Sequence, residues 1–204
     1  MEYLRNIYDW VLAWADRPSG PKALAGISFA EASFFPIPPD VLLIPLALGK
    51  KERALYFGIL CSIASVMGAA LGYGIGLWLW WGITSEFSHF AQFFFDHVPG
   101  FDRESFFNIK ALYDKYNFMI IFTAGFTPIP FKLFTISAGA FGINFPLFIL
   151  AGSVSRTARF MLVTLLIKLY GEPIRGFIDK YFNLLALLFT ILLFGGFFLL
   201  KFIF

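Results

Sequence analysis

Charged residues are scarce in this chain: only 14% of its 204 residues are Asp, Glu, Lys or Arg. Hydrophobic residues make up 59% and aromatic residues 21%, and the mean hydropathy is +0.76. A soluble domain needs more polar surface than this to enclose its core. The composition therefore predicts an integral membrane protein, with no room for a soluble catalytic domain beside its apolar segments.

Cysteine is nearly absent as well. The single Cys61 lies in an apolar run, which excludes an intramolecular disulfide and a cysteine metal site. Neither histidine has a second ligand at metal-binding spacing, so we expect no metal and no other cofactor. The net charge of +3 is dispersed and includes no basic run of the kind that binds nucleic acid.

The N-terminal segment has no uninterrupted apolar core, which a cleavable signal peptide would require. Its apolar residues recur at helical spacing, with charged residues on the other faces: Leu4, Ile7, Val11 and Trp14. We expect residues 1–22 to form an amphipathic helix in the membrane interface, ended by Pro18, Gly20 and Pro21.

A cluster of prolines interrupts the apolar stretch 23–49, in the sequence Pro36-Ile37-Pro38-Pro39-Asp40. Proline lacks a backbone donor and clashes with the preceding turn, so a straight helix cannot run through these residues. We predict a re-entrant hairpin of two short helices joined at these prolines. Its second leg, 40–49, is about 15 Å long, roughly half of a hydrocarbon core.

Three further stretches are long and apolar enough to cross a membrane: 54–84, 144–170 and 181–200. The segment 86–115 mixes phenylalanine with charge and predicts helices that lie on the membrane surface, with Asp102 as a candidate N-cap.

A second break, Pro128-Ile129-Pro130, interrupts the apolar run 118–142. Superposing the two breaks places Lys132 against Asp40, and each break is followed by a short apolar leg, a glycine and a predicted span. The chain therefore contains an internal repeat. Because the single crossing 54–84 separates the copies, we expect the two hairpins to be inverted and to face each other. Such paired breaks indicate a substrate site near the midplane of the membrane.

Two acidic residues occur in these apolar segments, Glu31 and Asp40. An ionised carboxylate is costly there unless it is paired or faces a wet cavity. Both are candidates for proton coupling or gating. The alternatives are structural: Glu31 could cap an amide of the break, and Asp40 could cap the second half-helix.

The deep cations are Lys132, Arg156 and Arg159. Lys132 begins the second leg after the second break, where unpaired N–H groups favour anions, and is a candidate phosphate-binding residue. Its alternative is to extend to the interface. The two arginines lie one helical turn apart, and either bind the phosphate or pair with Glu31 and Asp40.

Glycines recur at every fourth position of the first predicted span, at Gly68, Gly72 and Gly76. Small residues at this spacing let another helix approach closely, so we assign them to helix packing. The short Gly-x-Gly sequence within this run lies inside a helix and not between a strand and a helix, which excludes a dinucleotide-binding loop.

Three motifs carry a resemblance to a known family: the sequence 31–40, the sequence Gly72-Tyr73-Gly74-Ile75-Gly76, and the sequence 126–132 followed by Gly139 and Gly142. With them, the chain from about Leu24 to Tyr170 resembles the DedA superfamily, also called the VTT-domain or SNARE-associated Golgi protein family. It looks closest to the YqaA-like bacterial branch.

The resemblance implies two re-entrant hairpins facing each other across the bacterial cell (inner) membrane. It also implies the movement of lipids between leaflets, either polyprenyl phosphate carriers or phospholipids. Members of the main bacterial branch have an acidic pair in the first hairpin and an arginine pair around the proline of the second. Here Glu31 and Asp40 match the acids at shorter spacing. Lys132 stands where the second arginine would be, and Gly125 falls near the first.

We therefore expect an all-α integral membrane protein with two inverted hairpins, about three spanning helices and interfacial amphipathic helices. Its membrane domain would be 23–170, between the helix 1–22 and the segment 171–204, which holds a loop and the last span. The expected function is translocation of a phosphate-bearing lipid, by a flippase or a scramblase, with membrane lipids as partners and homo-oligomerisation left open.

An enzyme is not expected. The rival is an intramembrane lipid-phosphate phosphatase, which would need a nucleophile or general base, and no histidine lies in the hairpins. A membrane scaffold without transport activity is the third alternative, and it would leave the deep charges unexplained.

Overall fold

The computed structural model describes residues 18–81, 86–98, 102–127, 129–171 and 173. These residues are mostly helical and contain no β-strand, so the predicted all-α class is confirmed. The span predicted at 181–200 and nearly all of the amphipathic helix predicted at 1–22 lie outside the described residues. The helices, in chain order, are α2 (Gly20–Ser33), α3 (Asp40–Gly49), the short 3₁₀ turn η1 (Lys51–Arg53), α4 (Ala54–Trp80), α5 (His89–His97), α6 (Arg103–Phe126), α7 (Phe131–Ala140) and a last helix, Phe145–Gly171.

Two of these helices are long and apolar enough to cross a membrane. They are Lys51–Trp80, in which η1 continues into α4, and Phe145–Gly171, with 30 and 27 residues. Their positions agree with the spans predicted at 54–84 and 144–170. Both findings support a membrane protein.

The first proline cluster separates α2 from α3. Pro39 is the N-cap of α3, whose bounds are those of the predicted second leg. Pro21 lies in the first turn of α2, where a missing N–H costs nothing. Of the residues that we expected to end the N-terminal helix, Pro18 lies in a turn, and Gly20 and Pro21 belong to the first turn of α2.

The second break separates α6 from α7, and α6 itself contains a kink. It begins at Arg103, where the backbone N–H of Ser105 donates to Asp102 Oδ1 at 2.8 Å. This bond makes Asp102 an N-cap, as predicted, and holds the pKa of its carboxyl below the usual value. The segment then runs to Phe126, but non-helical backbone at Tyr116 divides it into two helical parts. This division agrees with the boundary between the helices predicted in 86–115 and the first leg of the hairpin predicted at 118–142.

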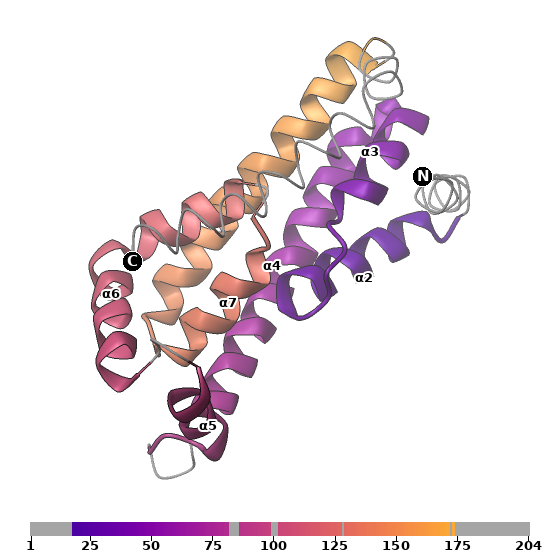
Figure 1. Ribbon diagram of the computed structural model, residues 1–204. Helices are drawn as coiled ribbons and strands as arrows, with labels where there is room; N and C mark the ends of the chain where they lie inside the picture. Colours follow the sequence, from indigo (N-terminus) through magenta and orange to yellow (C-terminus); the bar gives the residue numbers. More distant parts are fainter. Residues whose placement is uncertain (1–17, 82–85, 99–101, 128, 172, 174–204) are drawn as a thin grey trace.

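Helix α4 is the centre of the fold, with α2 and α3 on one side and α7 against it farther along (Figure 1). Three of its glycines, Gly68, Gly72 and Gly76, lie where α2 and α7 touch it. A Cβ atom at Gly68 would overlap the carbonyl of Phe29 in α2, and one at Gly76 would overlap the carbonyl of Ile136 in α7. Side chains larger than hydrogen are therefore excluded at these positions of α4.

An aromatic cluster closes the far end of α4 against α5 and α6. Trp80 is 9% exposed and its ring stacks on that of Phe106, with ring centroids 5.7 Å apart. Phe94 and Phe95 of α5 add their rings to the same cluster. Trp78, two residues before Trp80 in α4, is 79% exposed, whereas Trp80 is a core residue.

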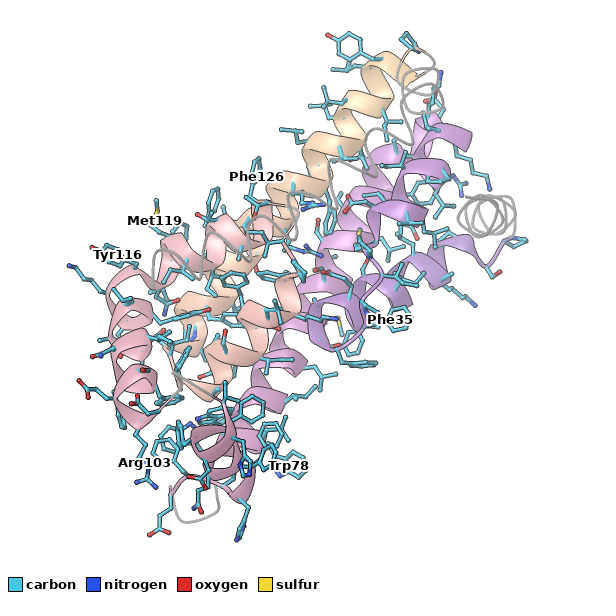
Figure 2. All side chains as sticks on the ribbon, in the orientation of Figure 1. Phe35, Trp78, Arg103, Tyr116, Met119 and Phe126 are labelled. Atoms are coloured by element: carbon cyan, nitrogen blue, oxygen red, sulfur yellow. The ribbon has the colours of Figure 1, made fainter. Side chains whose placement is uncertain are left out.

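Large apolar side chains cover the outer surface. Figure 2 shows Tyr116, Met119 and Phe126 projecting from the outer face of α6, and Trp78 projecting from the end of α4. Met119 is 62% exposed. An outer surface of this kind is unfavourable in water and suits contact with lipid.

Candidate functional site

Helices α2 and α7, which flank the two breaks, meet beside α4. The hydroxyl of Thr135 in α7 donates to the carbonyl of Ala32, in the last turn of α2, at 2.8 Å. A Cβ atom at Gly72 would overlap that hydroxyl, so α4 also reaches the same point. Segments that are 103 residues apart are thus joined by a buried hydrogen bond.

Glu31 and Arg156 form a buried ion pair at this junction. Glu31 lies in the last turn of α2, and its Oε2 accepts a hydrogen bond from Arg156 Nη2 at 2.5 Å. The side chains are 9% and 3% exposed, respectively. Glu31 therefore does not cap an amide of the break, which was the structural alternative.

Arg156 has further partners around its guanidinium. Its Nε donates to the hydroxyl of Ser65 on α4 at 2.7 Å. The guanidinium also lies over the rings of Phe131 and Phe160, at 5.0 and 4.6 Å from their centroids. Such cation–π contacts and hydrogen bonds offset the cost of burying the charge.

Asp40 and Arg159 form the second ion pair, one helical turn farther along the last helix. Arg159 Nη2 donates to Asp40 Oδ2 at 2.6 Å. Its Nη1 donates to the backbone carbonyl of Thr127, the first residue after α6, also at 2.6 Å. Asp40 is the first residue of α3, so one guanidinium connects both breaks.

The four charges form one network. Each of Glu31 and Arg156 interacts electrostatically with Asp40 and Arg159 as well as with its own partner. Two acids and two bases leave the network neutral. The sequence left open whether the arginines bind a ligand or pair with the acids, and in this structure both are paired.

Lys132 is not part of this network. It lies in the first turn of α7, is partly buried, and has no hydrogen-bond or ion-pair partner among the described residues. It is therefore a free positive charge on the segment that follows the second break.

The prolines of the breaks differ in their surroundings. Pro36 is exposed, Pro39 is buried at the start of α3, and Pro38 and Pro130 are intermediate. Pro128 lies outside the described residues. The exposed Phe34, 60% accessible, stands at the edge of the first break.

Two polar partners of the charges were not predicted: the hydroxyl of Ser65 and the carbonyl of Thr127. A serine in an apolar helix gives no signal of its partner, because it can bond to its own helix. The proline at 128 was the one available signal for Thr127, since breaking a helix frees carbonyls.

In the described part of the chain, no three His, Cys, Asp or Glu side chains lie together in a way that could hold a metal ion. What the described residues of the site offer chemically is two ion pairs and, at Lys132, one ammonium group without a hydrogen-bond or ion-pair partner. These groups can bind an anion or exchange ion-pair partners.

Comparisons with known proteins place the chain among proteins of similar length. It is 31% identical over 210 residues to an uncharacterized protein from Haemophilus influenzae, a match that covers 98% of this chain and 100% of the relative. The chain belongs to the family of that protein. An uncharacterized protein from Histophilus somni is 32% identical over 164 residues, covering 80% of this chain and 81% of the relative. No family model matches the chain, and no solved structure matches it.

Proposed function

We propose that the protein moves a phosphate-bearing lipid between the leaflets of a membrane, as a flippase or a scramblase. The observation that carries this proposal is the buried charge network between two broken helices, where Arg159 touches both breaks. Charges inside apolar segments are costly and are kept where a polar group must be handled. Broken helices at corresponding positions of two repeats are typical of midplane transport sites.

The proposal includes the arrangement in the membrane. Helices α2 and α3, and α6 and α7, would form two re-entrant hairpins that face each other in a multi-pass protein of the bacterial inner membrane. Two observations support it: each pair is separated by prolines, and α3 and α7 have only 10 residues each. A helix of that length spans about half of the hydrocarbon core.

Membership of the DedA superfamily is part of the same proposal. The resemblance implies an arginine near Gly125, but a Cβ atom there would overlap the hydroxyl of Ser155 on the last helix. This chain instead brings Arg156 and Arg159 to the junction from that last helix. The cations of the site would thus come from a different segment. Proton coupling through Glu31 or Asp40 stays a prediction.

The hairpin arrangement predicts opposite accessibility of the two breaks. Ile37 and Ile129 are 41% and 36% exposed and lie in the first and second break. Single cysteines at these positions, in a Cys61→Ser background, should react with membrane-impermeant thiol reagents added to opposite faces of oriented vesicles. Labelling of both positions from the same face would contradict the inverted hairpins. Cys61 is buried, and its contact with the Ser28 hydroxyl is one that serine can keep.

The phosphate proposal predicts a charge-specific effect at Lys132. Removing a charged hydrogen-bond donor costs about 1.5–3 kcal/mol, so Lys132→Ala should slow the translocation of phosphate lipids about tenfold or more. Lys132→Arg keeps the charge and should retain most of the rate. Initial rates in liposomes at matched protein incorporation give the comparison. An unchanged rate in Lys132→Ala with every phosphate lipid tested would remove Lys132 from the site. Lys115→Ala, an exposed cation on α6, is the matched control and should leave the rate unchanged.

A further inference from the structure

The two ion pairs of the network differ in accessibility. The side chains of Arg156 and Glu31 are 3% and 9% exposed, whereas those of Arg159 and Asp40 are 17% and 19% exposed. Arg156 is also held by Ser65 and enclosed between two aromatic rings. Among the described residues, the carboxylate of Asp40 has a direct hydrogen bond and ion pair with Arg159 alone. A ligand that enters the junction therefore meets the Arg159–Asp40 pair.

Arg159 is able to bind an anion without leaving its place. Its bond to the carbonyl of Thr127 fixes the guanidinium independently of Asp40. A guanidinium has more N–H donors than the two that Arg159 uses here, and its planar fork matches the oxygens of a phosphate. Loss of the Asp40 contact would make further N–H donors of Arg159 available to the phosphate of a lipid head group.

The same contact links the two breaks. Asp40 begins α3, Thr127 directly follows α6, and Arg159 donates to both. If an anion takes the place of the Asp40 carboxylate, the first break loses a direct connection to the second. Binding of an anion at Arg159 would thereby change the relative position of the two breaks.

We propose that Asp40 is an exchangeable counter-anion of Arg159, displaced by the phosphate of a lipid head group. This inference rests on the proposed function and identifies the binding residue and the group that competes with the substrate. The free charge of Lys132, on the segment after the second break, supplies additional attraction for the phosphate. Phe34 and Ile37 are exposed at the first break, 60% and 41%, and suit the apolar chain of a lipid more than free phosphate.

The first test is binding of dioctanoyl phosphatidic acid to the full-length protein in detergent micelles, measured by calorimetry at fixed salt. Asp40→Asn removes the competing charge and keeps the shape, so the dissociation constant should fall about tenfold. Arg159→Gln should lose measurable binding. An affinity in Asp40→Asn that is unchanged or weaker than in the wild type overturns the proposal, and so does absence of binding to both proteins.

Two controls separate competition from general electrostatics. Glu52→Gln makes the same change in net charge at an exposed position of η1, and should leave the affinity unchanged. If Glu52→Gln raised the affinity for dioctanoyl phosphatidic acid as much as Asp40→Asn does, the proposal that Asp40 competes locally with the phosphate would be overturned. Dioctanoylglycerol, which has no phosphate, should bind Asp40→Asn no more tightly than the wild type. Inorganic phosphate should bind much more weakly than dioctanoyl phosphatidic acid. Equal affinity for inorganic phosphate would overturn the choice of a lipid ligand.

A second measurement does not depend on the stability of a charge variant. Spin labels at Ile37 and Ile129, in the Cys61→Ser background, report the separation of the two breaks by electron paramagnetic resonance. Saturating dioctanoyl phosphatidic acid should shift the distance distribution, and an unchanged distribution would overturn the release of Asp40. If the wild type translocates phosphate lipid but Asp40→Asn shows no gain in affinity, this inference is rejected and the proposed function stands. Binding and a distance shift without translocation would reject the proposed function alone.

Discussion

Replacing Arg156 by methionine should destabilise the protein more than any other single change in the charge network. The substitution leaves the carboxylate of Glu31, 9% exposed, without its partner. Breaking a buried pair by removing one member costs about 3–5 kcal/mol, because an uncompensated charge remains inside. It also removes the donor to Ser65 and the cation that lies between Phe131 and Phe160.

The double variant Glu31→Met/Arg156→Met tests whether the unpaired carboxylate of Glu31 causes that loss of stability. It removes both charges and fills the space with apolar side chains, so most of the stability should return. The matched control is Lys110→Met, which breaks the exposed pair with Asp114 on α6 and should cost about 1 kcal/mol or less. Free energies of unfolding in mixed micelles give the comparison. A double variant as unstable as Arg156→Met would show that the pair is not what the single change disrupts.

Adding one methyl group at Gly76 should produce the second large effect. The new Cβ atom would overlap the backbone carbonyl of Ile136, and the backbone nitrogen of Ala140 is 3.0 Å away. Backbone cannot rotate aside as a side chain can, so α4 and α7 would have to separate. Overpacking typically costs about 1–3 kcal/mol, and a clash with backbone should reach or exceed the upper part of that range.

Gly74→Ala is the matched control for this change. Gly74 lies in the same helix, and a Cβ atom there meets no atom within 4 Å. Because alanine favours a helix by about 1 kcal/mol over glycine, this variant should be as stable as the wild type or slightly more stable. Thermal unfolding of both variants in the same detergent measures the difference. Equal stability of Gly76→Ala and Gly74→Ala would contradict the close contact of α4 with α7.

The breaks were predictable from the sequence because proline acts locally. The prolines before Asp40 define the start of α3, and the charge-free run after Arg53 indicates the long helix α4. The division of the segment between Arg103 and Phe126 was predictable from its composition. Its charged first half and apolar second half look like separate elements, and non-helical backbone at Tyr116 separates two helical parts there.

The candidate site was found from the cost of charge in apolar segments, which is a local property of the sequence. The partners were not, because Glu31 and Arg156 are 125 residues apart, and Asp40 and Arg159 are 119 apart. Which acid meets which arginine depends on how the helices are rotated around α4. The contact of Arg159 with the Thr127 carbonyl, which links the two breaks, depends on that rotation as well.

The central claim is that this chain alone carries a phosphate lipid between leaflets. The most direct test is a leaflet-asymmetry assay in liposomes that contain only the purified protein, with fluorescent phospholipid and polyprenyl phosphate probes in parallel and phosphate release monitored. The account predicts that at least one phosphate-bearing probe equilibrates faster than in protein-free liposomes, without release of phosphate. Probe movement equal to that in protein-free liposomes, or release of phosphate from the probe, would contradict it.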